Sequence, residues 1–337
     1  MGCIEKPEPA KIHRRIEVRR FVPSLGAEVR RVQLADGIDE QTRAPRRRRT
    51  LGAMSELGGR TCLVTGATRG IGRATAEALA RMGAAVVLHG RDPAAVDAAC
   101  REIARESGNP NVSGVVADFS SLADVSRLAN DIAARHARLH VLVNNAGTSA
   151  RRRRVTRDGF EWLFGVNHLA PFLLTSLLLE NLKHGAPARV VNVASMAYKR
   201  SALDLDDPNW ERRSYRSLQA YGASKLANIL FTAELARRLD DSGVTANSLH
   251  PGVVATNIFN QLGWFGGLFT AVAKPFLLTP EAGAKTTIYL ASDPAVGAVS
   301  GKFFDRCRET ALDAPARDAA AARRLWEISA RLTGAVR

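Results

Sequence analysis

A tyrosine and a lysine four residues apart, Tyr221 and Lys225, have the chemistry for proton transfer. On a helix, positions four apart share one face, so the two side chains can act together. A phenol with a pKa of about 10 is a poor base at neutral pH, but a neighbouring ammonium stabilises the phenolate and lowers that pKa. We therefore expect Tyr221 to donate or accept a proton and Lys225 to lower the pKa of the phenol. A Tyr-x3-Lys pair alone more often marks only the surface of a helix.

A glycine-rich loop, Gly66-Ala-Thr-Arg-Gly70-Ile-Gly72, follows the apolar run that begins at Thr61. Glycine permits a tight turn and lets backbone amides and a helix N-terminus approach a pyrophosphate. Strand, glycine turn and Ala-rich helix follow one another in the order that a dinucleotide site needs. An ordinary turn between a strand and a helix is the alternative.

Around these residues, short β-branched runs alternate with amphipathic helical stretches. This alternation predicts a Rossmann-type, doubly wound sheet of about seven parallel strands flanked by helices, in a single domain. The expected strands are 60–65, 84–89, 112–117, 139–144, 188–194, 244–249 and 302–304. The expected helices are 70–82, 93–106, 121–136, 157–183 and 218–241.

The spacing Gly-x3-Gly-x-Gly, together with three further motifs, resembles the short-chain dehydrogenase/reductase family. Asn144-Asn-Ala-Gly147 closes the fourth expected strand, Tyr221-Gly-Ala-Ser-Lys225 lies on an expected helix, and His250-Pro-Gly-Val253 follows the sixth strand. Their order and separation match the family over about residues 57–305. The resemblance implies an oxidoreductase that moves hydride between a nicotinamide cofactor and a carbonyl or alcohol.

The resemblance also implies roles for two further polar residues. Ser195, at the end of the fifth strand, would hydrogen-bond the substrate oxygen, and Ala194 replaces the first of two serines that the family often has. Asn167 would organise a water and proton relay, or it is a buried polar residue that satisfies helix backbone. The catalytic set is therefore Asn167, Ser195, Tyr221 and Lys225, and its presence argues against a non-catalytic NADP(H)-binding scaffold or redox sensor.

The expected cofactor contacts follow the same motifs, with Lys225 binding the nicotinamide ribose. They are Gly66, Thr68, Arg69, Gly70, Ile71, Gly72, Arg91, Asp118, Phe119, Asn145, Ala146, Gly147, Tyr221, Lys225, Pro251, Gly252, Val253 and Thr256.

The residues after the second strand favour NADP(H) over NAD(H). Gly90 stands where an NAD site usually presents an acid to the ribose hydroxyls, and Arg91 follows it. Arg69 in the glycine loop is a second cation, and a guanidinium can pair bidentately with a 2′-phosphate. Either arginine facing water is the alternative. Asp118 resembles the family's adenine-contacting acid, or it caps the helix expected near Ser120.

Longer segments resemble the retinol dehydrogenase and WW-domain oxidoreductase branch of the family. Ser195 and Tyr221 stand 26 residues apart (221 minus 195), about twice the usual spacing, with the insert 198–210 between them. The runs 224–239 and 322–329 extend this resemblance. The hydrophobic N-terminal anchor of some members is absent, and Arg151–Arg154 is an unusual cationic run that solvation would explain.

The segment Thr256–Leu278 is among the most aromatic and apolar of the chain, and the family has its mobile substrate lid here, about 255–280. Apolar walls with a few polar groups suit hydrophobic ligands. We therefore expect a lipophilic aldehyde or ketone, or the matching alcohol, with retinal-like compounds ahead of sugars. The alternatives are that the segment packs on the sheet, on another subunit or on a membrane surface.

The composition of this chain, with 337 residues and a net charge of +15, limits which partners and which location we expect. Charge alone argues association and solubility, so no nucleic-acid partner is expected. No apolar run approaches the roughly 18 residues that span a bilayer, which leaves peripheral membrane contact open. The four cysteines, Cys3, Cys62, Cys100 and Cys307, form no metal or redox pair, which fits a reducing cytoplasm. The family resemblance implies a homodimer or homotetramer.

The basic residues 1–53 end in Arg46–Arg49 and show no sustained helical or strand period. We expect a tail that is either disordered or misassigned, with Met54 as an alternative start. The dehydrogenase domain is then residues 54–337.

Overall fold

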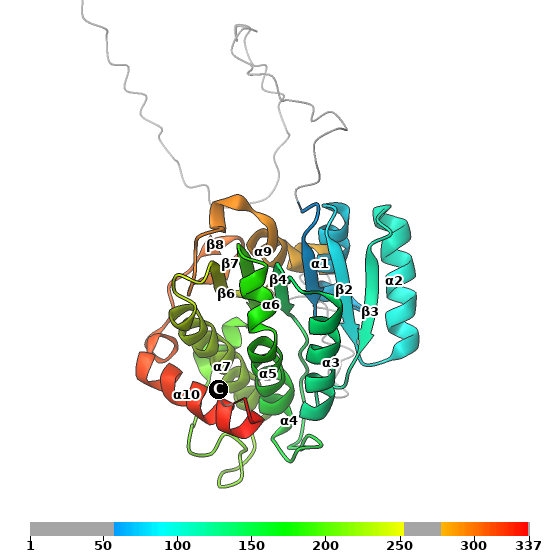
Figure 1. Cartoon of the computed structure of the whole chain (residues 1–337). Helices are drawn as coiled ribbons and strands as arrows, with labels where there is room; N and C mark the ends of the chain where they lie inside the picture. Colours follow the sequence, from blue (N-terminus) through cyan, green and yellow to red (C-terminus); the bar gives the residue numbers. More distant parts are fainter. Residues whose placement is uncertain (1–56, 253–277, 336–337) are drawn as a thin grey trace, which may run out of the picture. The chain divides into compact units, whose positions relative to one another are not determined.

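The computed structural model describes residues 57–252 and 278–335 of the chain (Figure 1). In these residues one sheet forms, with the strand order β3-β2-β1-β4-β5-β6-β7-β8. The strands are β1 (Thr61–Val64), β2 (Ala85–Gly90), β3 (Val112–Val116), β4 (Val141–Asn144), β5 (Ala188–Val193), β6 (Val244–His250), β7 (Phe303–Asp305) and β8 (Arg308–Glu309). All neighbours pair in parallel except β7 and β8, which confirms the predicted doubly wound sheet.

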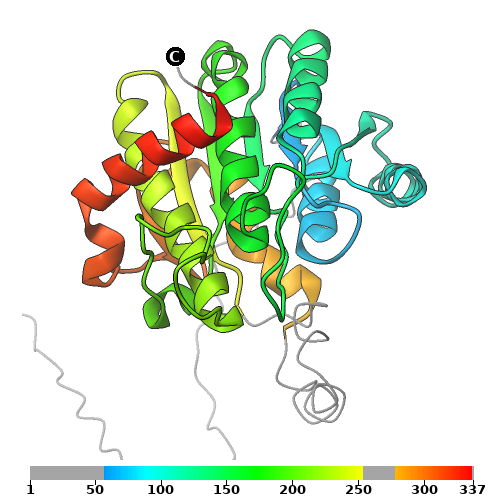
Figure 2. The same ribbon diagram turned by 90° about the horizontal axis from the view of Figure 1, so that it is seen from below.

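Helices cover both faces of this sheet (Figure 1). They are α1 (Gly70–Arg81), α2 (Pro93–Ser107), α3 (Leu122–Arg135), α4 (Trp162–Phe164), α5 (Ala170–Leu177), α6 (Leu179–His184), α7 (Ser217–Arg238), α9 (Pro280–Ser292) and α10 (Ala319–Thr333). Successive side chains of a strand point to opposite faces, so Leu63 joins a core with α3, α5 and α7, whereas Cys62 and Val64 join one with α1, α2 and α9. Outside the first layer, α10 packs against α7 and α5 (Figure 2).

The N-terminus of α1 differs from those of its neighbours α2 and α3. Asp92 accepts hydrogen bonds from the first amides of α2, and Ser121 accepts one from Asp124 in α3, as is typical of N-caps. No side chain caps α1, which begins after Arg69. Its first-turn amides therefore lack a side-chain acceptor, and such orphan donors suit an anionic ligand.

The predicted single helix 157–183 is wrong. The helical structure begins at Trp162 and passes through a π-helix, Gly165–Leu169, before α5 and α6. Pro171 has no N–H to donate to the carbonyl of Asn167. The amide of the preceding residue, Ala170, donates to the carbonyl of Gly165, five residues earlier. The π-helix, a feature frequent at functional sites, therefore carries Asn167.

The edge strand β8 was not predicted. It forms a hairpin with β7 through Arg306 and Cys307, whose φ angles are +50° and +60°. Such turns usually contain Gly or Asn, so this one has no sequence signal.

Several predictions fall on residues outside the described ranges: the tail 1–53, most of the lid at 255–280, and the cofactor contacts Val253 and Thr256. Within 57–252 and 278–335, none of the helices has both the length and the apolar character needed to cross a membrane.

Candidate active site

The predicted motifs meet at one edge of the sheet. The glycine loop follows β1, Asn145–Gly147 follows β4, Ser195 follows β5, and Pro251-Gly252 follows β6. Because these strands are parallel, their carboxyl ends share an edge, which is where open α/β sheets bind ligands. Gly66, Thr68, Arg69, Gly70, Ile71 and Gly72 lie in the loop and the first turn of α1.

The glycines let the loop pack against the segment after β4. Gly66 has φ +64°, and a Cβ there would lie 2.9 Å from the Cα of Ala146. At Gly72 a Cβ would lie 2.3 Å from the carbonyl oxygen of Gly66. Asn145 Nδ2 donates to the carbonyls of Thr65 (2.8 Å) and Gly66 (3.2 Å), so this predicted cofactor contact uses its amide to hold the loop.

Two further supports of the loop, Thr65 and His89, were not found from the sequence. Thr65 Oγ1 accepts hydrogen bonds from the amides of Asn145 and Ala146, both at 2.9 Å. The amide of Gly66 donates to Nδ1 of His89 (3.3 Å), whose Nε2 lies 3.1 Å from the carbonyl oxygen of Ala117. Burial lowers the pKa of His89 to about 4, so the neutral ring accepts at Nδ1 and donates at Nε2.

Phe119, a predicted cofactor contact, stacks on this histidine. The ring centroids of Phe119 and His89 are 4.3 Å apart, and Phe119 is 5% exposed. Its ring therefore supports the loop from below the site.

Ser195, Tyr221 and Lys225 are brought together beside the loop after β4. The Ser195 hydroxyl hydrogen-bonds the phenol of Tyr221, and Lys225 Nζ lies 5.6 Å from the centre of the tyrosine ring. Lys225 is buried, and its Nζ donates to the carbonyl of Val193 at 3.1 Å. A Cβ on the exposed Gly147 would lie 3.5 Å from Lys225 Nζ.

Burial dominates the protonation of this group. It raises the pKa of Tyr221 to about 12, against the smaller and opposite effect of the Ser195 hydrogen bond. It also lowers the pKa of Lys225 to about 8. This differs from the expectation that Lys225 lowers the pKa of the phenol, because in the protein alone burial has the largest effect on Tyr221 and the opposing effect comes from Ser195. At neutral pH, Tyr221 is therefore a protonated phenol, the form that donates a proton.

Asn167 is almost fully buried, and its side chain is held by hydrogen bonds outside its own helix. Oδ1 accepts from the amide of Thr148 (2.8 Å), and Nδ2 donates to the carbonyl of Thr148 and to Ser224 Oγ, both at 3.1 Å. Ser224 Oγ in turn donates to the carbonyl of Tyr221 at 2.7 Å. Neither Thr148 nor Ser224 was predicted as a partner of Asn167. Thr148 holds Asn167 to the loop after β4, and Ser224 connects it to the helix that carries Tyr221 and Lys225.

Comparison with known proteins agrees with this geometry. A family model described as short chain dehydrogenase matches residues 60–263. The chain belongs to this family. Human retinol dehydrogenase 13 is 44% identical over 281 residues, which cover 82% of this chain and 85% of the relative. Human retinol dehydrogenase 14 is 45% identical over 292 residues, with coverage of 82% and 87%. This dehydrogenase is thus an oxidoreductase acting on CH–OH groups, of the retinol dehydrogenase branch.

Solved structures share its fold. A putative uncharacterized protein from Mycobacterium paratuberculosis superimposes with a TM-score of 0.68 at 35% identity, and the match covers 82% of this chain and 94% of that one. The RhlG/NADP active-site complex of Pseudomonas aeruginosa gives a TM-score of 0.60 at 28% identity, covering 74% and 96%.

In this short-chain dehydrogenase, exposed cations and a crowded glycine surround the glycine loop, where the family binds its nicotinamide cofactor. Arg69 and Arg91 are both exposed, and neither forms an ion pair with any part of the chain that the structure describes. The uncapped N-terminus of α1 supplies amides beside them. A Cβ at Gly90 would lie 2.6 Å from Thr68 Cγ2 and 2.7 Å from Val96 Cγ2, so the acid of an NAD site has no room here without displacing neighbours.

Asp118 does not cap the following helix. Its Oδ1 accepts from the amide of Ser120 at 3.0 Å, and Oδ2 lies 3.5 Å from the guanidinium of Arg157. The cap of α3 is Ser121. The capping alternative for Asp118 is therefore wrong, and the predicted adenine contact stays a prediction.

Two arginines of the Arg151–Arg154 run are used in the dehydrogenase fold. Arg153 Nε donates to the carbonyl of Asn209 at 2.9 Å, and the Arg154 guanidinium lies 4.4 Å from the centre of the Trp162 ring. Simple solvation therefore does not explain these two residues. Arg153 ties the loop after β4 to the insert between Ser195 and Tyr221, and Arg154 ties it to α4.

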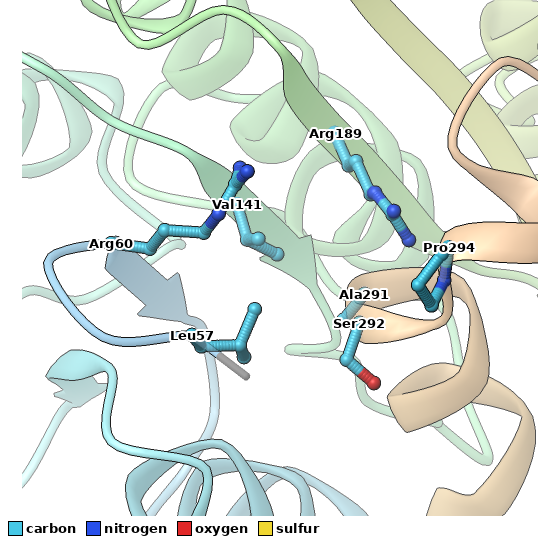
Figure 3. A pocket seen from close by; sticks show the side chains of 7 residues that line it. All are labelled: Leu57, Arg60, Val141, Arg189, Ala291, Ser292 and Pro294. Atoms are coloured by element: carbon cyan, nitrogen blue, oxygen red, sulfur yellow. The ribbon is translucent and has the colours of Figure 1, made fainter. Parts of the chain in front are cut away.

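A separate cavity of about 170 Å³ lies at the opposite edge of the sheet. Figure 3 shows its lining: Leu57, Arg60, Val141, Arg189, Ala291, Ser292 and Pro294. Arg189 donates to the carbonyls of Leu290 (3.0 Å) and Asp293 (2.9 Å) at the end of α9, where a cation is favourable. The cavity stands at the amino ends of β1, β4 and β5 and so takes no part in the candidate active site.

Proposed function

We propose that this dehydrogenase uses NADPH to reduce lipophilic aldehydes or ketones. The observation that carries the proposal is the setting of Tyr221: a partly buried, protonated phenol beside Ser195, packed against an apolar cluster. That cluster consists of Ala150, Leu163, Trp210 and Ala220, with Trp162 and Tyr215 packed against it. These four residues are buried, so the apolar wall that a substrate can touch is formed by the partly buried rings of Trp162 and Tyr215 beside Tyr221. Such a wall favours apolar substrates over sugars and small hydroxy acids. The relatives named retinol dehydrogenase agree with such a substrate.

The residues of the site have separate tasks in this reaction. Tyr221 donates its phenolic proton to the carbonyl oxygen as that oxygen gains negative charge. The Ser195 hydroxyl holds the same oxygen and stabilises the phenolate that remains. The buried Lys225 ammonium stabilises that phenolate electrostatically, and Asn167 fixes the helix that carries both residues. The nicotinamide cofactor, when bound, supplies the hydride.

The choice of NADP(H) over NAD(H) is supported by charge and by space. Arg69 and Arg91 offer two exposed guanidinium groups near the uncapped start of α1, and a phosphate pairs well with guanidinium. The crowding around Gly90 by Thr68 and Val96 works against an acidic residue there. A solved relative of the same fold is described as an NADP complex.

We also propose a cytoplasmic location and a homodimer or homotetramer. Cys62, Cys100 and Cys307 are free thiols, which suits a reducing compartment. The partners of this assembly would be further copies of the chain, and no nucleic acid is proposed.

The experiment that tests the substrate proposal is a panel of carbonyl compounds assayed by loss of NADPH absorbance, with the Tyr221→Phe protein as the blank. Long-chain, aromatic and retinal-like aldehydes should give a higher kcat/KM than small polar carbonyls. If small polar carbonyls react with much higher kcat/KM than every lipophilic compound, the substrate class is wrong although the reaction type stands.

A further inference from the structure

Glu161 is a buried carboxylate that the proposed proton transfer does not use. It is 1% exposed. Its Oε1 and Oε2 accept from the first amides of α4, at Leu163 (3.0 Å) and Phe164 (2.8 Å). Oε1 also accepts a hydrogen bond from the hydroxyl of Tyr215 at 3.0 Å. A buried charge is tolerated only with such partners, so Tyr215 is bound to Glu161 by an interaction that is costly to break.

This link joins the two helical segments that carry the proton-transfer residues. Glu161 caps α4, which continues directly into the π-helix with Asn167. Tyr215 stands just before α7, which carries Tyr221. A displacement on either side of the link would therefore be felt in the candidate active site.

Three further hydrogen bonds hold the insert and the start of α7 against Glu161 and the loop that follows β4. Asn209 Oδ1 accepts from the amide of Glu161 at 3.0 Å, and the carbonyl of Asn209 accepts from Arg153. Ser217 Oγ donates to the carbonyl of Ala150 at 2.5 Å. The insert thus lies fixed along the loop that follows β4.

Trp210 anchors the insert in a buried apolar cluster. Its φ is +55°, a left-handed conformation that a bulky residue adopts only when its surroundings enforce it. The Arg213 guanidinium lies 3.8 Å from the centre of its ring, and Tyr215 meets that ring edge-on at 5.6 Å between centroids. Trp210 is packed with Ala150 in the cluster that Tyr215 and Tyr221 both contact. The contacts of Tyr215 therefore reach both Glu161 and the apolar surroundings of Tyr221.

We propose that Tyr215 and Glu161 form a positioning pair that sets the apolar wall of the carbonyl site and thereby selects lipophilic substrates. The inference rests on the proposed function, which it deepens. Loss of the Tyr215 hydroxyl leaves the Glu161 carboxylate with one donor fewer and frees the segment before α7 from Glu161, whereas the hydrogen bond from Glu161 to Asn209 still holds the insert. Substrates long enough to lean on the wall then lose contact, whereas a small carbonyl reaches Ser195 and Tyr221 as before.

The test compares Tyr215→Phe with the wild type on one lipophilic aldehyde and one small aldehyde. We expect kcat/KM for the lipophilic aldehyde to fall about 10-fold, mostly through KM, with changes of less than about 3-fold for the small aldehyde and for NADPH. Tyr198→Phe is the matched control, because the hydroxyl of the buried Tyr198 likewise takes part in one hydrogen bond, which it accepts from the amide of Asp313. The control should leave the ratio between the two aldehydes unchanged.

Glu161→Gln keeps an acceptor for Tyr215 and should retain most of the selectivity. In a protein that already carries Glu161→Ala, Tyr215→Phe should cause little further loss of selectivity, because the effects of two residues that act through one contact are not additive. An equal loss for both aldehydes and NADPH in Tyr215→Phe would reduce the pair to a purely structural role and overturn the proposal.

Binding of the matching lipophilic alcohol, followed by quenching of tryptophan fluorescence, separates this proposal from the proposed function. Weaker binding in Tyr215→Phe than in Tyr198→Phe supports the wall even if no aldehyde is turned over, in which case the proposed reaction is wrong. Turnover of the lipophilic aldehyde with an unchanged ratio in Tyr215→Phe would leave the reaction standing and refute the wall.

Discussion

The protonation of Tyr221 is set by its burial, and this can be measured directly. Because burial raises the pKa of the phenol to about 12, Tyr221 should stay protonated from about pH 7 to about pH 10 in the protein without cofactor. The difference in ultraviolet absorbance between the wild type and Tyr221→Phe reports the phenolate of this residue alone. A phenolate band that appears below about pH 9 would contradict the dominance of burial.

Arg91 should determine much of the preference between the two cofactors. A charged hydrogen bond to a phosphate contributes about 1.5–3 kcal/mol, so Arg91→Ala should lower kcat/KM for NADPH by about 10-fold or more and leave that for NADH nearly unchanged. Arg101→Ala removes an equally exposed arginine further along α2 and serves as the control. An equal loss with both cofactors in Arg91→Ala would argue that this side chain meets no 2′-phosphate. Gly90→Asp is a poorer probe, because its side chain would first have to displace Thr68 and Val96.

Single residues differ in how far the sequence predicts them. Ser195, Tyr221 and Lys225 carry a family spacing, and the structure brings them together. His89 and Thr65 bond mainly to backbone groups of segments distant in the chain, an arrangement that leaves no spacing pattern. The elevated pKa of Tyr221 also escaped prediction, because burial depends on the packing of several elements and not on the Tyr-x3-Lys pair.

Among the elements, the glycine loop, β2 and β3 are joined through one neutral histidine, and this makes their stability depend on pH. The pKa of His89 is about 4 in the folded protein, against about 6.5 in an unfolded chain. As pH falls below about 6.5, the unfolded chain takes up a proton that the folded chain refuses. The contribution is thus fully present above about pH 6.5 and is lost by about pH 4, with a change of up to roughly 3 kcal/mol in the free energy of unfolding.

Urea unfolding of the wild type and His89→Asn, at about pH 7.5 and about pH 4.5, measures this effect. The variant should be less stable at the higher pH but should lose less stability on acidification. His168, whose pKa burial also lowers to about 4, is present in both proteins and so cancels in the comparison. If acidification lowered the free energy of unfolding of both proteins by the same amount, His89 would not be the residue that makes the stability depend on pH.

The elements were predictable where burial leaves a simple pattern. Parallel strands buried on both faces read as apolar runs, and β1 to β6 stand within a few residues of their predicted bounds. The prediction of one continuous helix over 157–183 was wrong, because the spacing of apolar residues reveals neither the break at Pro171 nor the helix start capped by Glu161. Consequently the π-helix around Asn167, which the site needs, is the element that the sequence predicted least well.

For the whole molecule, the first 53 residues are expected to be dispensable. Their sequence shows no sustained helical or strand period with an apolar face that would seal a core. We therefore expect deletion of residues 1–53 to shift Tm by less than about 2 °C and to leave cofactor binding and kcat/KM within about 2-fold, as for changes remote from a core. Differential scanning calorimetry and NADPH titration measure both effects. A fall in Tm of more than about 5 °C, or loss of cofactor binding, would make these residues part of the domain.

The doubly wound parallel sheet was predictable because strands alternate with helices along the chain, whereas the closing hairpin was not, since β8 is a two-residue strand after a turn without glycine. The apolar wall beside Tyr221 was also beyond sequence reasoning. It depends on contacts between the insert and the loop after β4, and apolar residues in either segment do not reveal which of them meet.

The central claim, that Tyr221 donates the proton in an NADPH-dependent reduction, is tested most directly by Tyr221→Phe. General acid catalysis commonly supplies about 10²–10⁴-fold in rate, so kcat for a lipophilic aldehyde should fall by that factor. The Kd for NADPH, measured by fluorescence titration of the same preparation, should change by less than about 3-fold. Near-normal kcat in this variant, with NADPH binding intact, would remove Tyr221 from its role.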